Sequence, residues 1–117
     1  MKFIYNDEDS VSEFTYEVVR ALGSDPRVTV DGYFTTYHVD QDGFEAYCTP
    51  EFDEAEEDTR ERLERGVLLS GVELCSGDLH HRTSTREISL DGTAKDVADR
   101  IVQHALETIQ AFKNGSI

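Results

Sequence analysis

The residues best suited to chemistry lie around a short turn and comprise Cys75, Asp78, His80 and His81. A cysteine can act as a thiolate nucleophile when a nearby imidazole takes its proton, and Cys, His and Asp are also zinc ligands. Adjacent side chains of a strand point to opposite faces, so His80 and His81 would meet at one metal only in a loop. Because no diagnostic spacing is present, we expect polar turn residues beside a buried cysteine, with a Cys/His enzyme as a minor alternative.

The other histidines and the second cysteine also have structural interpretations. His38 lies within an alternating segment and His104 is one position off an apolar helical stripe, so both are expected at a boundary with an exposed polar tip. Cys48, like Cys75, is expected to be a small buried side chain at a strand end. The chain contains no Gly-rich phosphate loop, Cys-x-x-Cys, His-Glu-x-x-His or Gly-x-Ser-x-Gly motif. The sequence therefore predicts no catalytic residue, no metal site and no cofactor.

Residues 49–66 read TPEFDEAEEDTRERLERG, and seven of the eleven residues from Glu51 to Glu61 are acidic. We interpret this stretch as a surface helix with Thr49 as its N-cap, Pro50 at the first helical position and Gly66 at its end. Acids in the first turns, arginines in the last turns and acid-before-base pairs at i, i+4 are all expected of such a helix. Its narrow apolar stripe consists of Phe52, Ala55, Thr59 and Leu63.

The outward face of that predicted helix carries more carboxylates than helix stability explains. Like charges at helical spacing destabilise a helix by a few tenths of a kcal/mol per close pair. A solvated surface accounts for many charge runs, and contact with a basic partner is the other interpretation. The acids predicted to contact a partner are Asp53, Glu54, Glu57, Glu61 and Glu64.

Three tyrosines are candidate contact residues beside these acids. Tyr33 and Tyr37 share one face of a predicted strand, and Tyr47 comes from the next strand, which we expect to pair with it. Packing within the sheet or core is one explanation of this group. An exposed tyrosine surface would instead suit a protein interface, where tyrosine is enriched.

The charge of the chain restricts the classes of partner. The 117 residues carry 25 acids and 11 bases, a net charge of −14, with 16 acids and four bases in residues 1–60. A field of this sign repels nucleic-acid phosphates and anionic membranes and attracts basic proteins. No segment resembles a signal peptide or a membrane-spanning helix. We therefore expect a cytoplasmic protein that binds neither nucleic acid nor membranes directly, and its oligomeric state stays open.

Hydrophobic periodicity and turn residues predict a single α+β domain over residues 1–117, with 115–117 as a loose tail. Short turns rather than long crossovers separate most strands, which favours a mostly antiparallel sheet of about five strands with three helices, in the order β-α-β-β-α-β-β-α. The Asp31-Gly32 step is either a bulge or a tight hairpin. Helices are predicted at residues 10–22, 49–66 and 93–113, and strands at residues 2–5, 28–39, 44–48, 67–75 and 82–90.

Two main hypotheses follow for function. The first is a small acidic, non-enzymatic inhibitor that covers the basic, nucleic-acid-binding surface of a protein partner, as immunity proteins against nuclease toxins and phage anti-defence proteins do. The second is a domain adapted to a salty cytoplasm, whose acids only maintain solvation. Three lysines against eight arginines agree with the second hypothesis. The concentration of acids in one half of the chain agrees better with the first.

Overall fold

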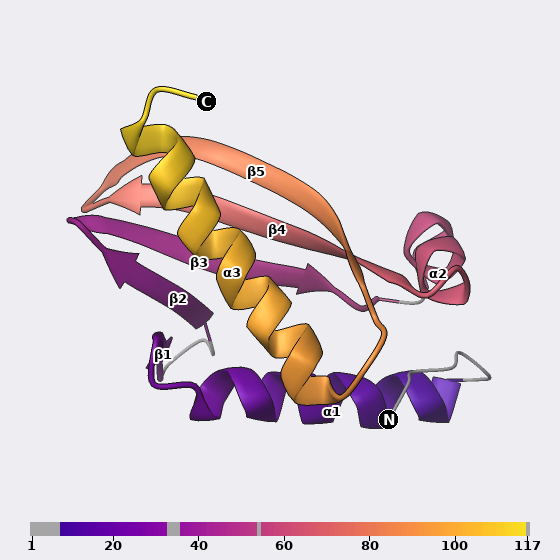
Figure 1. The fold of residues 1–117 in the computed structure, drawn as a ribbon. Coiled ribbons are helices and arrows are strands. Elements are labelled where there is room, and N and C mark those ends of the chain that lie inside the picture. The colour runs from indigo at the N-terminus through magenta and orange to yellow at the C-terminus, as the bar shows by residue number, and fades with distance from the viewer. Residues whose placement is uncertain (1–7, 33–35, 54, 117) are drawn as a thin grey trace.

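Five antiparallel strands form one sheet whose spatial order follows the chain, β1-β2-β3-β4-β5 (Figure 1). The computed structural model describes residues 8–32, 36–53 and 55–116. Helix α3 runs across the sheet and packs against α1 near its own N-terminal end, while α2 lies apart, between β3 and β4 (Figure 1). The elements are α1 (Glu8–Ser24), β1 (Val28–Asp31), β2 (Thr36–Gln41), β3 (Phe44–Glu51), α2 (Glu57–Glu64), β4 (Val67–Ser76), β5 (Leu79–Ser89) and α3 (Ala94–Lys113).

The predicted fold class, α+β with three helices and an antiparallel sheet of five strands, is confirmed. The order of the described elements is α-β-β-β-α-β-β-α, and the strand predicted at residues 2–5 lies outside the described residues. Ser10, predicted to open the first helix, lies inside α1. The segment 28–39 contains two strands, because Val28 pairs with Val39 and Asp31 with Thr36 in antiparallel register. The Asp31-Gly32 step therefore leads into a hairpin rather than a bulge.

The prediction of a helix over residues 49–66 was wrong at its N-terminal end. Thr49 and Pro50 continue β3, where Pro50 pairs with Ser70 of β4, and α2 begins only at Glu57. The described pairing of β3 with β2 ends at Cys48, so this part of β3 is paired with β4 on one side. A proline, which has no N–H to donate, is compatible with a strand at such a position. The N-cap of α2 is Glu56, whose side chain makes no capping hydrogen bond.

The hydrophobic core lies between the sheet and the helices α1 and α3. The predicted stripe of the last helix is confirmed, since Val97, Ile101, Ala105 and Ile109 are all buried and Phe112 packs beside them. Helix α1 adds Phe14, Val18 and Leu22 to the same cluster. The sheet contributes the side chains that alternate toward the helices, among them Val39, Ala46, Cys48, Leu68, Val72, Leu74 and Ile88.

Helix α3 begins with the capping box that its sequence predicts. The Thr93 side chain accepts from the backbone N–H of Asp96, and the Asp96 carboxylate accepts from the backbone N–H of Thr93. We expect Thr93→Ala to lower the free energy of unfolding by about 1 kcal/mol, because an orphan backbone donor loses its acceptor. Chemical denaturation measures the change, and Thr93→Ser serves as the control that keeps the cap. Equal loss of stability in both variants would contradict this role of the hydroxyl.

Candidate protein-binding surface

The two sides of the sheet differ in what covers them. Side chains on one side, such as Val39, Ala46 and Val72, are buried under α1 and α3. The register places the intervening residues on the opposite side, which we call the open face. Among the described helices only α2 borders the open face, at the end of the sheet near Leu69 and Glu87. Within the described residues, the open face is therefore the side of the sheet that α1 and α3 leave uncovered.

Every charged side chain that alternation places on the open face, within the described strands, is a carboxylate. Each of the five strands contributes at least one, and none contributes a lysine or an arginine to this side. Asp40 and Glu45 stand directly opposite each other in the β2–β3 ladder, an arrangement that costs stability because like charges repel across strands. The carboxylates of the open face are Asp31, Asp40, Glu45, Glu51, Glu73 and Glu87.

His38 and Tyr47 lie together near the middle of these acids. They are cross-strand partners, and their ring centroids are 4.9 Å apart. Nδ1 of His38 lies 2.6 Å from Oδ1 of Asp40, and Nε2 lies 3.2 Å from Oδ2 of Asp31, without the geometry of a hydrogen bond. The prediction that His38 has an exposed tip was wrong, because only 5% of the residue is exposed. Its neighbours Asp31, Asp40 and Tyr47 come from three strands.

Tyr47 is the tyrosine that the structure places on the open face. Its hydroxyl donates to Oε2 of Glu45 at 2.7 Å, and this bond is the main cause that raises the pKa of Tyr47 to about 12. Tyr47 therefore stays neutral and can offer a partner an aromatic surface among carboxylates. Tyr37 pairs with Cys48 rather than with Tyr47 and packs against the core on the covered side. It is not part of the open face, and Tyr33 lies outside the described residues.

The acids predicted around α2 extend the acidic surface past the end of the sheet. Asp53, Glu57, Glu61 and Glu64 are all exposed, whereas Glu54 lies outside the described residues. Only the last three belong to the helix, since Asp53 precedes it and accepts from the backbone N–H of Ala55. Of the predicted apolar stripe, Thr59 and Leu63 are buried, whereas Ala55 is exposed because it precedes the helix.

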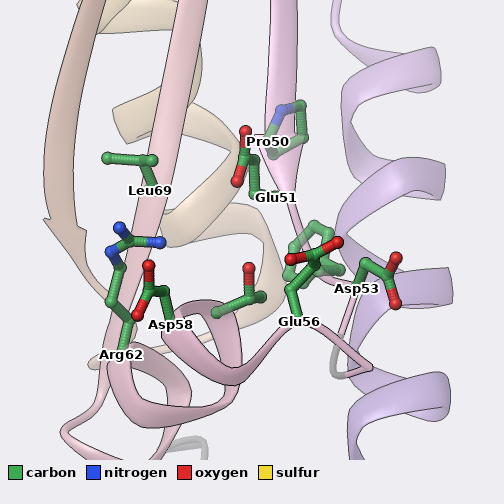
Figure 2. A pocket seen from close by; sticks show the side chains of 9 residues that line it. Pro50, Glu51, Asp53, Glu56, Asp58, Arg62 and Leu69 are labelled. Carbon is green, nitrogen blue, oxygen red and sulfur yellow. The ribbon is translucent and has the colours of Figure 1, made fainter.

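A hollow of about 600 Å³ lies where α2 meets the open face (Figure 2). Four carboxylates line it with a single base, Arg62 (Figure 2). The Nε atom of Arg62 is 3.6 Å from Glu87, and Arg65 donates to the same carboxylate at 3.1 Å. Arg62 of α2 and Arg65, the residue that caps its C-terminal end, thus approach one acid at the edge of the sheet. The residues that line the hollow are Pro50, Glu51, Phe52, Asp53, Glu56, Asp58, Thr59, Arg62 and Leu69.

Several other bases are paired on the helical side of the molecule or at its rim. Arg27 bridges Asp25 and Asp99 at 2.7 and 3.0 Å, and its hydrogen bond is the main cause that lowers the pKa of Asp25. Arg86 pairs with Glu107 of α3, and Lys113 pairs with Asp42 at 2.7 Å. The described strands therefore present only carboxylates among their charged side chains on the open face, where Arg62 and Arg65 approach Glu87 at one end, whereas the helical side has mixed charge.

The cysteine and histidine candidates around the turn are divided between the two sides of the sheet. Cys48 is buried as expected, whereas Cys75 is only half-buried. Partial burial, with Glu73 and Glu45 nearby, raises the pKa of Cys75, which works against a thiolate. His80 pairs with Cys75 across the β4–β5 hairpin, whereas His81 packs between Phe44 and Phe112 on the covered side. Both cysteines are free, and within the described ranges no group of three or more Cys, His, Asp or Glu residues could hold a metal ion.

His104 is the ionisable residue that sequence reasoning placed least well. It was predicted at a boundary, but it is fully buried in α3 between the sheet hydroxyls of Ser70 and Ser84. Its Nδ1 lies 2.8 Å from Ser70 Oγ, and its Nε2 lies 3.1 Å from Ser84 Oγ. Burial, with a contribution from Arg86, lowers the pKa of His104 to about 4. The neutral imidazole therefore connects α3 to two strands of the sheet.

Comparisons with protein-family models, curated proteins and solved structures found no match to this chain. Over the residues that the structure describes, none of the helices has the length and apolar character needed to cross a membrane. Inferences about function therefore depend on the acidic surface itself.

Proposed function

We propose that this protein is a small, non-enzymatic, acidic binding protein that acts in the cytoplasm. It covers a basic surface of a protein partner, of the kind that otherwise binds nucleic acid. The carboxylates of the open face and of α2 take the places of phosphates, and Tyr47 supplies an aromatic contact among them.

The observation that carries this proposal is the composition of the open face. Acids occupy all of its charged positions in the described strands, and Asp40 stands opposite Glu45 at a cost in stability. A basic partner would reverse that cost, since each carboxylate would then face a cation. The hollow at the same surface has space for a long basic side chain, and its four carboxylates would attract that side chain.

Adaptation to high salt explains acidity in general but not this distribution. An adaptation to solvent acts on the entire surface, whereas the bases here lie among the helices and at the rim. The two hypotheses also differ in their expectation for folding. A salt-adapted domain loses its structure in dilute buffer, whereas a partner-binding domain stays folded there.

A matched pair of charge reversals tests the proposed surface. One variant carries Glu51→Lys and Glu73→Lys on the open face, and the other carries Glu13→Lys and Glu17→Lys on exposed positions of α1. Both variants have a net charge of −10, since each reversal adds two charges to −14. We expect the open-face variant to bind the basic partner at least about tenfold more weakly, because two charge contacts become repulsive.

The partner is first captured from the native host on immobilised protein and eluted with rising salt. Titration calorimetry then compares both variants with the unmodified protein at one salt concentration. Equal weakening by both variants would show that only net charge matters and would remove the proposed surface. Circular dichroism in dilute buffer tests the salt-adapted alternative on the same samples.

A further inference from the structure

The last strand of the sheet, β5, has one edge without a strand partner among the described residues. It is 11 residues long and contains neither lysine nor proline. Proteins commonly protect exposed edges by keeping the strand short or by adding lysine, proline or bulges. The opposite edge strand, β1, has only four residues and ends at Asp31, so it is protected in this way. The β5 edge is irregular only near its start and is regular from residue 82 to residue 89, so it is the edge suited to pairing.

The charge of β5 indicates which partner would pair with its free edge. Its charged residues are Arg82, Arg86 and Glu87, so β5 has a formal charge of +1 in a chain of net −14. A basic partner is attracted to the open face and gains little at this edge. A second copy of the acidic chain is repelled by most of the surface and least by this strand.

We propose that two copies of this chain pair through β5 in antiparallel orientation around a two-fold axis at Thr85. The two five-stranded sheets then form one continuous sheet. Paired residues point to the same side of a sheet, so a two-fold axis makes one residue face its own copy. The inference goes beyond the proposed function and does not depend on it.

The register follows from the regular part of β5. The β4–β5 ladder is irregular near Cys75 and His80, and the regular part runs from residue 82 to residue 89. An axis at Ser84 would place Arg82 opposite Arg86, and an axis at Arg86 would place that arginine opposite itself. With the axis at Thr85, Thr83 faces Glu87 and Ser84 faces Arg86. Like charges are then not directly opposite, and threonines meet at the centre.

Lysine and glutamate at Thr85 test this pairing. Thr85 is exposed, so neither Thr85→Lys nor Thr85→Glu disturbs the core. In a two-fold pair, each substitution places two like charges opposite each other, and we expect each variant alone to dimerise at least about tenfold more weakly. Mixing the two variants places lysine opposite glutamate, and we expect the dimer to return. Sedimentation velocity measures both results.

Controls separate this contact from other associations. Thr29→Lys adds the same charge to β1, at the other edge, and leaves the dimer intact. A monomeric unmodified protein at high micromolar concentration in 0.5 M salt, or a mixture that stays monomeric, would overturn the proposal. So would equal dissociation by Thr29→Lys.

Salt separates the failure of this inference from failure of the proposed function. Self-association strengthens as salt rises, because two chains of net −14 repel each other less. Binding of a basic partner weakens as salt rises, because attraction is screened. Loss of the dimer with partner binding retained would contradict only this inference. Loss of partner binding with the dimer retained would contradict only the proposed function.

Discussion

Between pH 7 and pH 5 the free energy of unfolding is expected to fall by about 2 kcal/mol through His104 alone. Burial lowers the pKa of His104 from 6.5 to about 4 in the folded protein. His104 is therefore half-protonated near pH 6.5 in the unfolded chain but only near pH 4 in the folded protein. Stability from this residue is intact above about pH 6.5 and is lost as the pH falls toward 4, by about 3 kcal/mol in total.

The variant His104→Gln isolates this effect from the other ionisable groups. Glutamine can still hydrogen-bond to Ser70 and Ser84, but it does not titrate. Denaturant unfolding at pH 7, 6 and 5 is compared between the two proteins, and their difference in free energy is the quantity of interest. Asp25, Asp42, Asp96 and Glu107 have lowered pKa values, so the stability they contribute is lost mainly at lower pH. A difference that stays constant with pH would refute a buried neutral imidazole.

Leu74→Ala is expected to lower the free energy of unfolding by about 3 kcal/mol, within the 2–5 kcal/mol typical of leucines removed from a core. Leu74 lies in β4 on the covered side of the sheet and is fully buried. The substitution removes apolar contacts and leaves a cavity that the surrounding side chains of α3 and the sheet fill only in part.

Leu79→Ala is the matched control for this prediction. Leu79 begins β5 in the same hairpin, but 60% of it is exposed. We expect its removal to change stability by less than about 0.5 kcal/mol, as for most surface substitutions. Guanidinium unfolding with a common m-value measures both variants. Similar losses at the two positions would mean that the covered side is not the main source of stability.

The elements that were predicted correctly have strong local signals. Thr93 with Asp96, followed by Val97 and Ile101 at helical spacing, specifies α3 through contacts within one helix. The second helix was misplaced because Thr49-Pro50 is a helix start in isolation. Only pairing with Ser70, which lies 20 residues away in sequence, shows that this dipeptide belongs to a strand. The competing signal was tertiary, and local propensity does not contain it.

The sequence predicted the negative charge of the candidate surface but only part of its position. The acid density of residues 51–61 indicated an acidic surface, and Glu57 and Glu61 are indeed exposed. The carboxylates of the open face are spaced along five strands, so no local run reveals them. His38 and His104 were misjudged for a related reason. The residues that bury them come from other elements, and their burial depends on strand register and helix packing.

The strict sequential order of the sheet also has a consequence for folding kinetics. Each strand pairs with its nearest strand neighbour along the chain, so each ladder closes a short loop at small cost in chain entropy. The packing of α1 against α3 instead joins opposite ends of the chain. Proteins rich in local contacts fold faster than those dominated by distant ones. The sheet can therefore assemble hairpin by hairpin, and the docking of α1 is the step with the largest entropy of loop closure.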